Sequence, residues 1–259
     1  MTIVVSEVGG FGIAMVADSA VTVRHPAPIK VYEGAAKVQY SDVANVGFAM
    51  WGNACVDGVA MDAWLESFIA KRIQSGDSMP VIADRLAVEM NLQLRATGRP
   101  WAELRRGIHI AGYVDDLPCL YHIHTGGDLA AQHELRVHKD FPDGLKISPG
   151  KYAHDLKVGM YHLRNGYFEV YGALFDSLYP FTTALQKLKF GWPFNSLEHR
   201  VSLHKLLVKF VADALIADEQ LPAVGGPLQG IGFTETGLKI DQRLSTTPNL
   251  YPCGTMAEF

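Results

Sequence analysis

Apolar residues near the N-terminus form two short runs that a glycine-rich stretch separates. Residues 2–8 are rich in β-branched side chains, residues 13–17 are apolar, and residues 9–12 supply turn-forming glycines. This pattern predicts a β-hairpin. Both strands are apolar on both faces, which is typical of strands that are covered on each side. A second hairpin is predicted at 37–40 and 44–50.

Helical spacing of the apolar residues begins after this second hairpin. Helices are predicted at 56–69 and 81–90, because apolar residues recur there every three or four positions. The other predicted elements are strands at 107–114 and 119–124, helices at 174–188 and 201–216, and a last hairpin at 229–234 and 237–240. Residues 135–170 mix proline, glycine, lysine and histidine, and no element is predicted there.

The order of these elements is strands, two helices, strands, two helices, strands. An α+β fold with two sheets packed face to face, and a helix layer outside each sheet, would cover every strand on both faces. We therefore predict a four-layer αββα sandwich in a single domain over residues 1–240. Residues 241–259 contain Pro248 and Pro252 and are predicted to form an irregular tail.

Composition narrows the class of protein. Of 259 residues, 48% are hydrophobic and 19% are charged, which is typical of a soluble globular chain. The net charge is −4 and no Lys/Arg run exists, so no nucleic-acid partner is predicted. No apolar stretch approaches the ~20 residues of a membrane helix, and no signal peptide is predicted. Cys55, Cys119 and Cys253 are odd in number and widely spaced, so neither a disulfide nor a metal site is predicted, and a cytoplasmic location is expected.

Several short sequence blocks stand in an order that is known from one enzyme family. They are Thr2-Ile3-Val4-Val5, Gly12-Ile13-Ala14-Met15-Val16-Ala17-Asp18-Ser19, Lys37-Val38 and the stretch from Gly47 to Ala54, with weaker blocks at 110–127 and 225–233. The arrangement resembles proteasome β subunits and the related bacterial peptidases, which are N-terminal-nucleophile hydrolases. The resemblance spans roughly residues 2–130 and 200–240. It implies the same αββα sandwich, with insertions near 135–170 and 178–200.

The resemblance implies that Thr2 is the nucleophile once Met1 has been removed. A threonine hydroxyl is a weak nucleophile, but the α-amine of a leading threonine can serve as its base. The reference pKa of that amine is about 7.7–8.0, so a useful fraction is neutral near pH 7. Because a tight turn at 9–12 lies between them, Thr2 and Asp18 can meet at one end of the hairpin.

Further roles follow from the resemblance alone. Lys37 would lie beside the Thr2 hydroxyl, Asp18 would hold Lys37 charged, and Thr125 would bond the N-terminal amine in place of the family's serine. The segment before Lys37 is longer than in the family, so Lys30 is a rival for the lysine role.

Two other roles are placed less directly. The oxyanion donor falls on the backbone N–H of Gly52, with Met50 as the alternative, and the side chain of Trp51 could block the pocket. The family's second aspartate corresponds to Asp218, which is displaced from the expected position.

The histidines were weighed as metal ligands. His122 and His124 share one strand face, and His109 lies on the presumed partner strand. No further close ligand is evident, and histidines paired across strands are more often hydrogen-bonded than metal-bound. Neither a metal nor any other cofactor is predicted.

The function predicted from the resemblance is that of a threonine peptidase that cleaves peptide bonds through an acyl-enzyme on Thr2. It would act as a homo-oligomeric ring, with an ATPase as a possible partner. Two alternatives stay open: an amidase of the same fold that acts on a small non-peptide amide, and a non-catalytic ring subunit.

Overall fold

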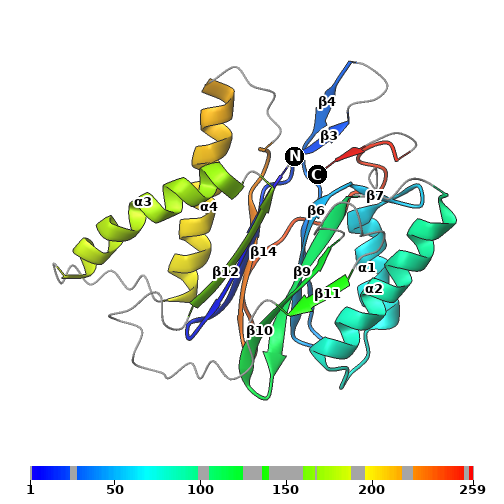
Figure 1. The fold of residues 1–259 in the computed structure, drawn as a ribbon, viewed down its shortest axis with the longest axis horizontal. Coiled ribbons are helices and arrows are strands. Elements are labelled where there is room, and N and C mark those ends of the chain that lie inside the picture. Colours follow the sequence, from blue (N-terminus) through cyan, green and yellow to red (C-terminus); the bar gives the residue numbers. More distant parts are fainter. Residues whose placement is uncertain are drawn as a thin grey trace.

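The computed structural model describes residues 2–23, 28–98, 105–124, 136–139, 160–166, 168–187, 196–217, 224–253 and 257–258 (Figure 1). The strands are β1 (Ile3–Gly9), β2 (Gly12–Ala17), β3 (Val21–Val23), β4 (Lys30–Tyr32), β5 (Val38–Ser41), β6 (Val46–Gly52), β7 (Cys55–Val56), β8 (Val59–Ala60), β9 (Arg106–Val114), β10 (Leu117–His124), β11 (Arg136–Lys139), β12 (Met160–Gly166), β13 (Gln229–Thr234), β14 (Gly237–Gln242) and β15 (Ala257–Glu258). The helices are α1 (Met61–Arg72), α2 (Met79–Ala96), α3 (Phe168–Lys187) and α4 (Leu197–Ala217).

Two five-stranded sheets form the centre of the molecule. Their strand orders are β12-β1-β2-β13-β14 and β11-β10-β9-β6-β5, and neighbouring strands run antiparallel in both. We call them the first and the second sheet. The predicted α+β class is confirmed, because helices and antiparallel sheets occupy separate stretches of the chain.

Three buried apolar clusters hold the sheets and helices together. One cluster joins Val4 and Met15 of the first sheet to Ala49 of the second. Another packs the second sheet on α1 and α2, and the third packs the first sheet on α3 and α4. Figure 1 shows the two helix pairs on opposite sides of the sheets.

The position of β1 explains why this strand is apolar on both faces. Val4 and Val8 belong to the cluster between the sheets, whereas Ile3 and Val5 belong to the cluster under α3 and α4. Successive side chains of a strand point to opposite faces, so a strand covered on both sides needs apolar residues at nearly every position. The position of β1 inside the molecule therefore requires apolar residues on both of its faces.

The stretch 56–60 differs from its prediction. It forms the small β7–β8 hairpin rather than the start of a helix, and α1 begins only at Met61. Asp57 and Gly58 at its turn both have positive φ, at 47° and 75°. An Asp-Gly pair is favoured where both turn residues need positive φ, and this local preference outweighs the helical spacing of Val56, Val59 and Ala60.

The C-terminal segment corrects the prediction made for the cysteines. Cys55 and Cys253 form a disulfide across a sequence separation of 198 residues. The expectation of no disulfide was therefore wrong, because sequence spacing says nothing about which loops the fold brings together. Tyr251 is buried beside this bond, and β15 pairs with β3. Within the described parts of the chain, no helix combines the length and apolar character that crossing a membrane requires.

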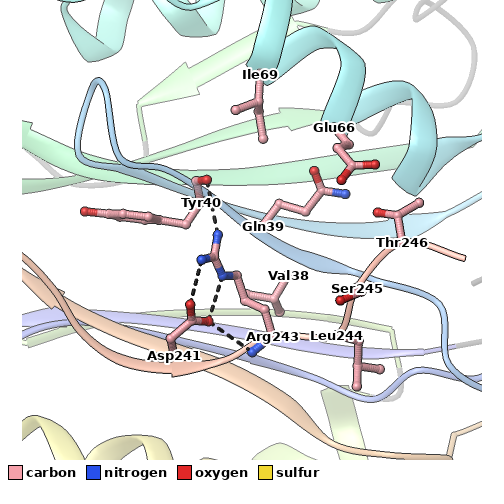
Figure 2. Close-up of a pocket in the computed structure, with 10 residues that line it drawn as sticks. All are labelled: Val38, Gln39, Tyr40, Glu66, Ile69, Asp241, Arg243, Leu244, Ser245 and Thr246. Atoms are coloured by element: carbon pink, nitrogen blue, oxygen red, sulfur yellow. Dashed lines mark hydrogen bonds and ion pairs between the residues drawn. The ribbon is translucent and has the colours of Figure 1, made fainter.

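A pocket of about 500 Å³ opens where β5, α1 and the segment after β14 meet (Figure 2). Arg243 lies in it, donates to the Asp241 carboxylate over 2.7 and 2.6 Å, and has its guanidinium carbon 5.7 Å from the centre of the Tyr40 ring. Val38, the residue after Lys37, is part of the lining.

Candidate functional site

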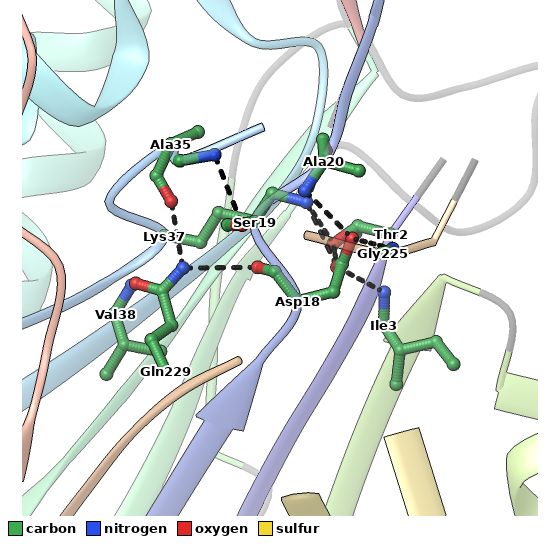
Figure 3. A network of polar contacts seen from close by, with 11 residues as sticks. Thr2, Ile3, Asp18, Ser19, Ala20, Ala35, Lys37, Val38, Gly225 and Gln229 are labelled. Atoms are coloured by element: carbon green, nitrogen blue, oxygen red, sulfur yellow. Dashed lines mark hydrogen bonds and ion pairs between the residues drawn. The ribbon is translucent and has the colours of Figure 1, made fainter. Parts of the chain in front are cut away.

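Thr2 and Asp18 meet at one end of the β1–β2 hairpin (Figure 3). Thr2 directly precedes β1 and Asp18 directly follows β2, whose register pairs Val4 with Ala17. The backbone N–H of Asp18 donates to Ile3 O over 3.3 Å, and the Thr2 hydroxyl donates to Asp18 Oδ1. The hairpin therefore brings together two residues that are 16 positions apart.

Lys37 completes the group from the second sheet, because it directly precedes β5. Its Nζ lies 2.7 Å from Thr2 Oγ1, 3.0 Å from Asp18 Oδ1 and 2.6 Å from Ala20 O. An ammonium carries three protons, and these three contacts can use all of them. The lysine is thereby aimed at the threonine hydroxyl.

Backbone donors fix the Asp18 carboxylate in place. Ile3 N donates to its Oδ1 over 3.0 Å, while Ala20 N and Gly225 N donate to Oδ2 over 3.1 and 3.2 Å. The Asp18 carboxylate is thus held in a fixed orientation beside Lys37 Nζ.

The site is closed to water in this structure. Thr2 is 1% exposed, and the side chains of Asp18 and Lys37 are fully buried. Burial lowers the pKa of Lys37 below its usual value, and the negative charge of Asp18 opposes that shift. Since a buried charge is costly without a partner, the Lys37–Asp18 pair depends on both members.

Lys30 and Lys37 are now distinguished by position. Lys30 is exposed on β4, opposite Val23, whereas Lys37 contacts Thr2 directly. Thr125 and Asp218, the other two side chains predicted for the site, lie outside the described residues.

The two candidate oxyanion donors differ in their backbone environment. Met50 N already donates to Lys37 O over 3.0 Å, so this N–H is engaged between β5 and β6. Gly52 ends β6 with φ at +93°, and a Cβ there would lie 2.5 Å from Arg105 O. Glycine is therefore required at position 52 for its backbone shape and for the close approach of Arg105.

Trp51 points into the space between the sheets. Its indole lies against the Cα of Gly107, and its Nε1 donates to His122 Nε2 over 3.0 Å. Both contacts are to strands of the second sheet, and Trp51 also packs against the apolar cluster between the two sheets.

Comparisons with known proteins place the fold. No known family profile matches the sequence, and no curated protein matches it. Two solved structures are similar in fold. Anbu (ancestral beta-subunit) from Yersinia bercovieri has a TM-score of 0.54 at 13% identity, covering 94% of this chain and 87% of that one. Anbu from Hyphomicrobium sp. strain MC1 has a TM-score of 0.50 at 11% identity, covering 96% and 91%.

These matches correct the family that the sequence suggested. The neighbours are Anbu proteins, which form a family related to the proteasome but distinct from its β subunits and from the bacterial peptidases. The fold is proteasome-related, and the narrower family assignment was wrong. Its strongest blocks, at 2–5, 12–19 and 37–38, lie in and around the β1–β2 hairpin and the start of β5.

The predicted histidine group forms a hydrogen-bonded cluster between the sheets. His109 Nδ1 lies 2.9 Å from Ser6 Oγ, and its Nε2 lies 2.7 Å from Asn165 Oδ1. Both ring nitrogens are thus occupied, and burial lowers the pKa of His109 to about 4. Among the described residues, no three His, Cys, Asp or Glu side chains are grouped to hold a metal ion.

Two contributors to the site were missed as site residues in the sequence. Gly225 donates to Asp18, and its Gly-Gly-Pro context was the available signal. Gln229, the first residue of β13, is fully buried and bonds to backbone atoms around the site. A glutamine at the start of an apolar strand carries no signal of chemistry, so only the fold could reveal it.

Proposed function

We propose that this chain is an N-terminal threonine hydrolase that cleaves peptide bonds through an acyl-enzyme on Thr2. The observation that carries the proposal is the convergence of the Thr2 hydroxyl, the Lys37 ammonium and the Asp18 carboxylate. A single domain built as a four-layer αββα sandwich of the N-terminal-nucleophile type is the fold that we propose for it. The packing of a helix pair outside each sheet supports this.

The reaction begins once whatever precedes Thr2 has been removed. The freed α-amine takes the hydroxyl proton while Oγ1 attacks the carbonyl carbon, and Lys37 stabilises the charge that develops on Oγ1. The protonated amine then gives its proton to the leaving amine as the peptide bond breaks. Water then attacks the resulting ester with the α-amine again as base. The bond between the acyl carbon and Oγ1 breaks, the ammonium returns the proton to Oγ1, and the product acid leaves with the Thr2 hydroxyl restored.

We assign the remaining roles as proposals of the same mechanism. Gly52 N–H would donate to the carbonyl oxygen as it becomes an oxyanion. Its position supports this, since Gly52 lies two residues beyond Met50, which bonds to Lys37. Thr125 and Asp218 would orient the N-terminal amine.

Replacing Thr2 tests the proposal directly. In protein with a free residue 2, Thr2→Ala should lower hydrolysis of fluorogenic peptides by at least about 10³-fold, because no other group replaces the nucleophile. Thr2→Ser keeps a hydroxyl and should retain activity. Intact mass after treatment with a β-lactone should show one adduct on the wild type and none on Thr2→Ala. Hydrolysis that survives in Thr2→Ala would falsify the assignment, and an adduct without peptide turnover would favour a non-peptide amidase.

One observation favours a non-catalytic role as the second candidate. Thr2 is 1% exposed, so a substrate could not reach its hydroxyl without movement of the surrounding chain. If this candidate holds, intact mass of the cellular protein should show residue 2 still blocked, and the β-lactone should not react.

Assembly and location belong to the same proposal. We propose a homo-oligomer, which light scattering would distinguish from a monomer, and an ATPase partner stays a prediction. The cytoplasmic location was predicted from cysteines taken as unpaired. It is at odds with the Cys55–Cys253 disulfide, because such bonds persist mainly in oxidising compartments.

A further inference from the structure

Gln229 links the two sheets at the site through its side-chain amide (Figure 3). Its Nε2 donates to Asp18 O over 3.1 Å and to Ala35 O over 2.8 Å, and its Oε1 accepts from Val38 N over 2.9 Å. The side chain is fully buried. An amide has two donors and one oxygen acceptor, and all of them here bond to backbone atoms.

The partners of this amide bracket the two charged residues of the site. Asp18 is itself one partner, and Ala35 and Val38 flank Lys37 on either side. Gln229 pairs with Ala17 in the first sheet, whereas Lys37 enters the second sheet. One side chain therefore ties the backbone that carries the carboxylate to the backbone that carries the ammonium.

We propose that Gln229 is a positioning residue that sets the separation of Lys37 Nζ from Thr2 Oγ1 and Asp18. This inference rests on the proposed function of the site. Lys37 reaches Thr2 from the opposite sheet, so any slip of one sheet against the other changes that separation. A misplacement of about 1 Å at a catalytic group can lower a rate by about 10²-fold.

A second side chain also bonds to the backbone beside Lys37, and the comparison shows what Gln229 contributes. Ala36 N donates to Asp62 Oδ2 over 3.1 Å, which anchors the segment before Lys37 to the start of α1. That bond holds the segment to α1, which packs on the second sheet. Gln229 bonds across to Asp18 O and accepts from Val38 N. Its loss would remove these cross-sheet bonds and leave the backbone before Lys37 joined to the first sheet's side through Ala35 N, which donates to Ser19 O over 3.1 Å.

The chain offers a matched control at the far end of β13. Asn45 also uses a side-chain amide to join the sheets: its Nδ2 donates to Thr234 O over 2.9 Å and to Glu235 O over 3.2 Å. Its Oδ1 accepts from the Tyr40 hydroxyl over 2.6 Å. Asn45 has φ at 53°, so glycine removes the amide without backbone strain.

The experiment compares Gln229→Met, which keeps the length of the side chain but not its hydrogen bonds, with Asn45→Gly. Both should lower the melting temperature. Only Gln229→Met should lower kcat for peptide hydrolysis, by about 10- to 100-fold with KM within about twofold, because the substrate contacts are unchanged. It should also move the ¹⁵Nζ signal of Lys37, while Asn45→Gly leaves that signal in place.

The kcat and the Lys37 signal together distinguish failure of the positioning role from failure of the proposed function. If Gln229→Met leaves the Lys37 signal unchanged, or if both variants move it equally, the positioning role is overturned whatever happens to kcat. If the wild type with a free Thr2 neither hydrolyses peptides nor reacts with the β-lactone, the proposed function fails. The Lys37 signal then still decides whether Gln229 positions the lysine.

Discussion

At the scale of single residues, the site is the buried ion pair of Lys37 and Asp18, and the Thr2 hydroxyl is hydrogen-bonded to both. Lys37 and Asp18 are 3.0 Å apart and fully enclosed, so each is the main compensation for the charge of the other. Removing one member of a buried pair leaves an uncompensated charge, which is costlier than removing both. Stability and activity can therefore be separated by comparing single and double substitutions.

Lys37→Met should abolish hydrolysis and lower the free energy of unfolding by about 3–5 kcal/mol, because Asp18 then stays buried without its cation. Adding Asp18→Asn should recover part of that stability without restoring activity, because the buried charge is removed but the amide keeps only one of the two oxygens that accept from backbone N–H groups. Urea unfolding and peptide hydrolysis measure the two effects. Equal stability of the single and the double variant would contradict the buried-pair description.

Two histidines with lowered pKa values, the buried His109 and the half-buried His162, make stability depend on pH. Burial lowers the pKa of His109 to about 4 and that of His162 to about 3. Below pH 6.5 the unfolded chain binds these protons first, so stability falls as pH falls. For each histidine, the expected slope is about 0.7 kcal/mol per pH unit at pH 6.5 and approaches about 1.4 kcal/mol per pH unit near pH 5. Urea unfolding at several pH values checks it, and His109→Asn should reduce the slope by about half.

At the scale of elements, β1 contacts the second sheet with one face and the helices α3 and α4 with the other. Its Glu7 points toward α4, where the carboxylate lies 2.9 Å from Arg200 Nη2 and 2.7 Å from His204 Nε2. Burial raises the pKa of Glu7, but Arg200 and His204 lower it by a larger amount, so that the pKa is about 2. The strand that begins beside Thr2 is thus pinned to α4 by a buried charge cluster.

Glu7→Gln should lower the free energy of unfolding by about 3–5 kcal/mol, because the Arg200 guanidinium is left buried without its anion. The stability that Glu7 contributes is present above its unfolded pKa near 4.5 and is lost as pH falls toward 2. Urea unfolding of wild type and variant at pH 7 and pH 3 measures both statements. A difference between the two proteins that does not shrink at pH 3 would contradict them.

The elements also show what a sequence can reveal. The apolar runs of β1 and β2 predicted a covered hairpin, and that hairpin alone brings Thr2 to Asp18. The strand β12, which pairs with β1 along seven residues, was not predicted. Its His162 lies opposite the buried Glu7 of β1, so this strand does not carry the apolar run that identified β1 and β2. Contacts of this kind, and the cross-sheet bonds of Gln229, depend on tertiary structure and leave no local pattern.

At the scale of the whole molecule, the Cys55–Cys253 bond joins the C-terminal segment to the β7–β8 hairpin. Tyr251 donates from the same segment to Ala54 O over 3.0 Å and to Asp62 Oδ1 over 3.2 Å. Asp62 in turn accepts from Ala36 N, next to Lys37. The end of the chain is therefore joined to the site through two buried side chains.

Reduction of this disulfide should destabilise the fold, because closing a loop of 198 residues restricts the unfolded chain. The chain-entropy estimate is about 5 kcal/mol. Thermal unfolding with and without reductant should show the loss, and Cys253→Ser should reproduce it and be insensitive to reductant. An unchanged melting temperature in both cases would argue that the bond does not form in solution.

The same covalent closure has a consequence for turnover of the protein itself. A machine that unfolds proteins by drawing the chain from its C-terminal side through a narrow pore would meet a closed ring of backbone when it reached Cys253. Two strands would then have to pass the pore together. Disposal from that end would have to wait for a reductant, which gives the oxidised molecule a longer life than its reduced form.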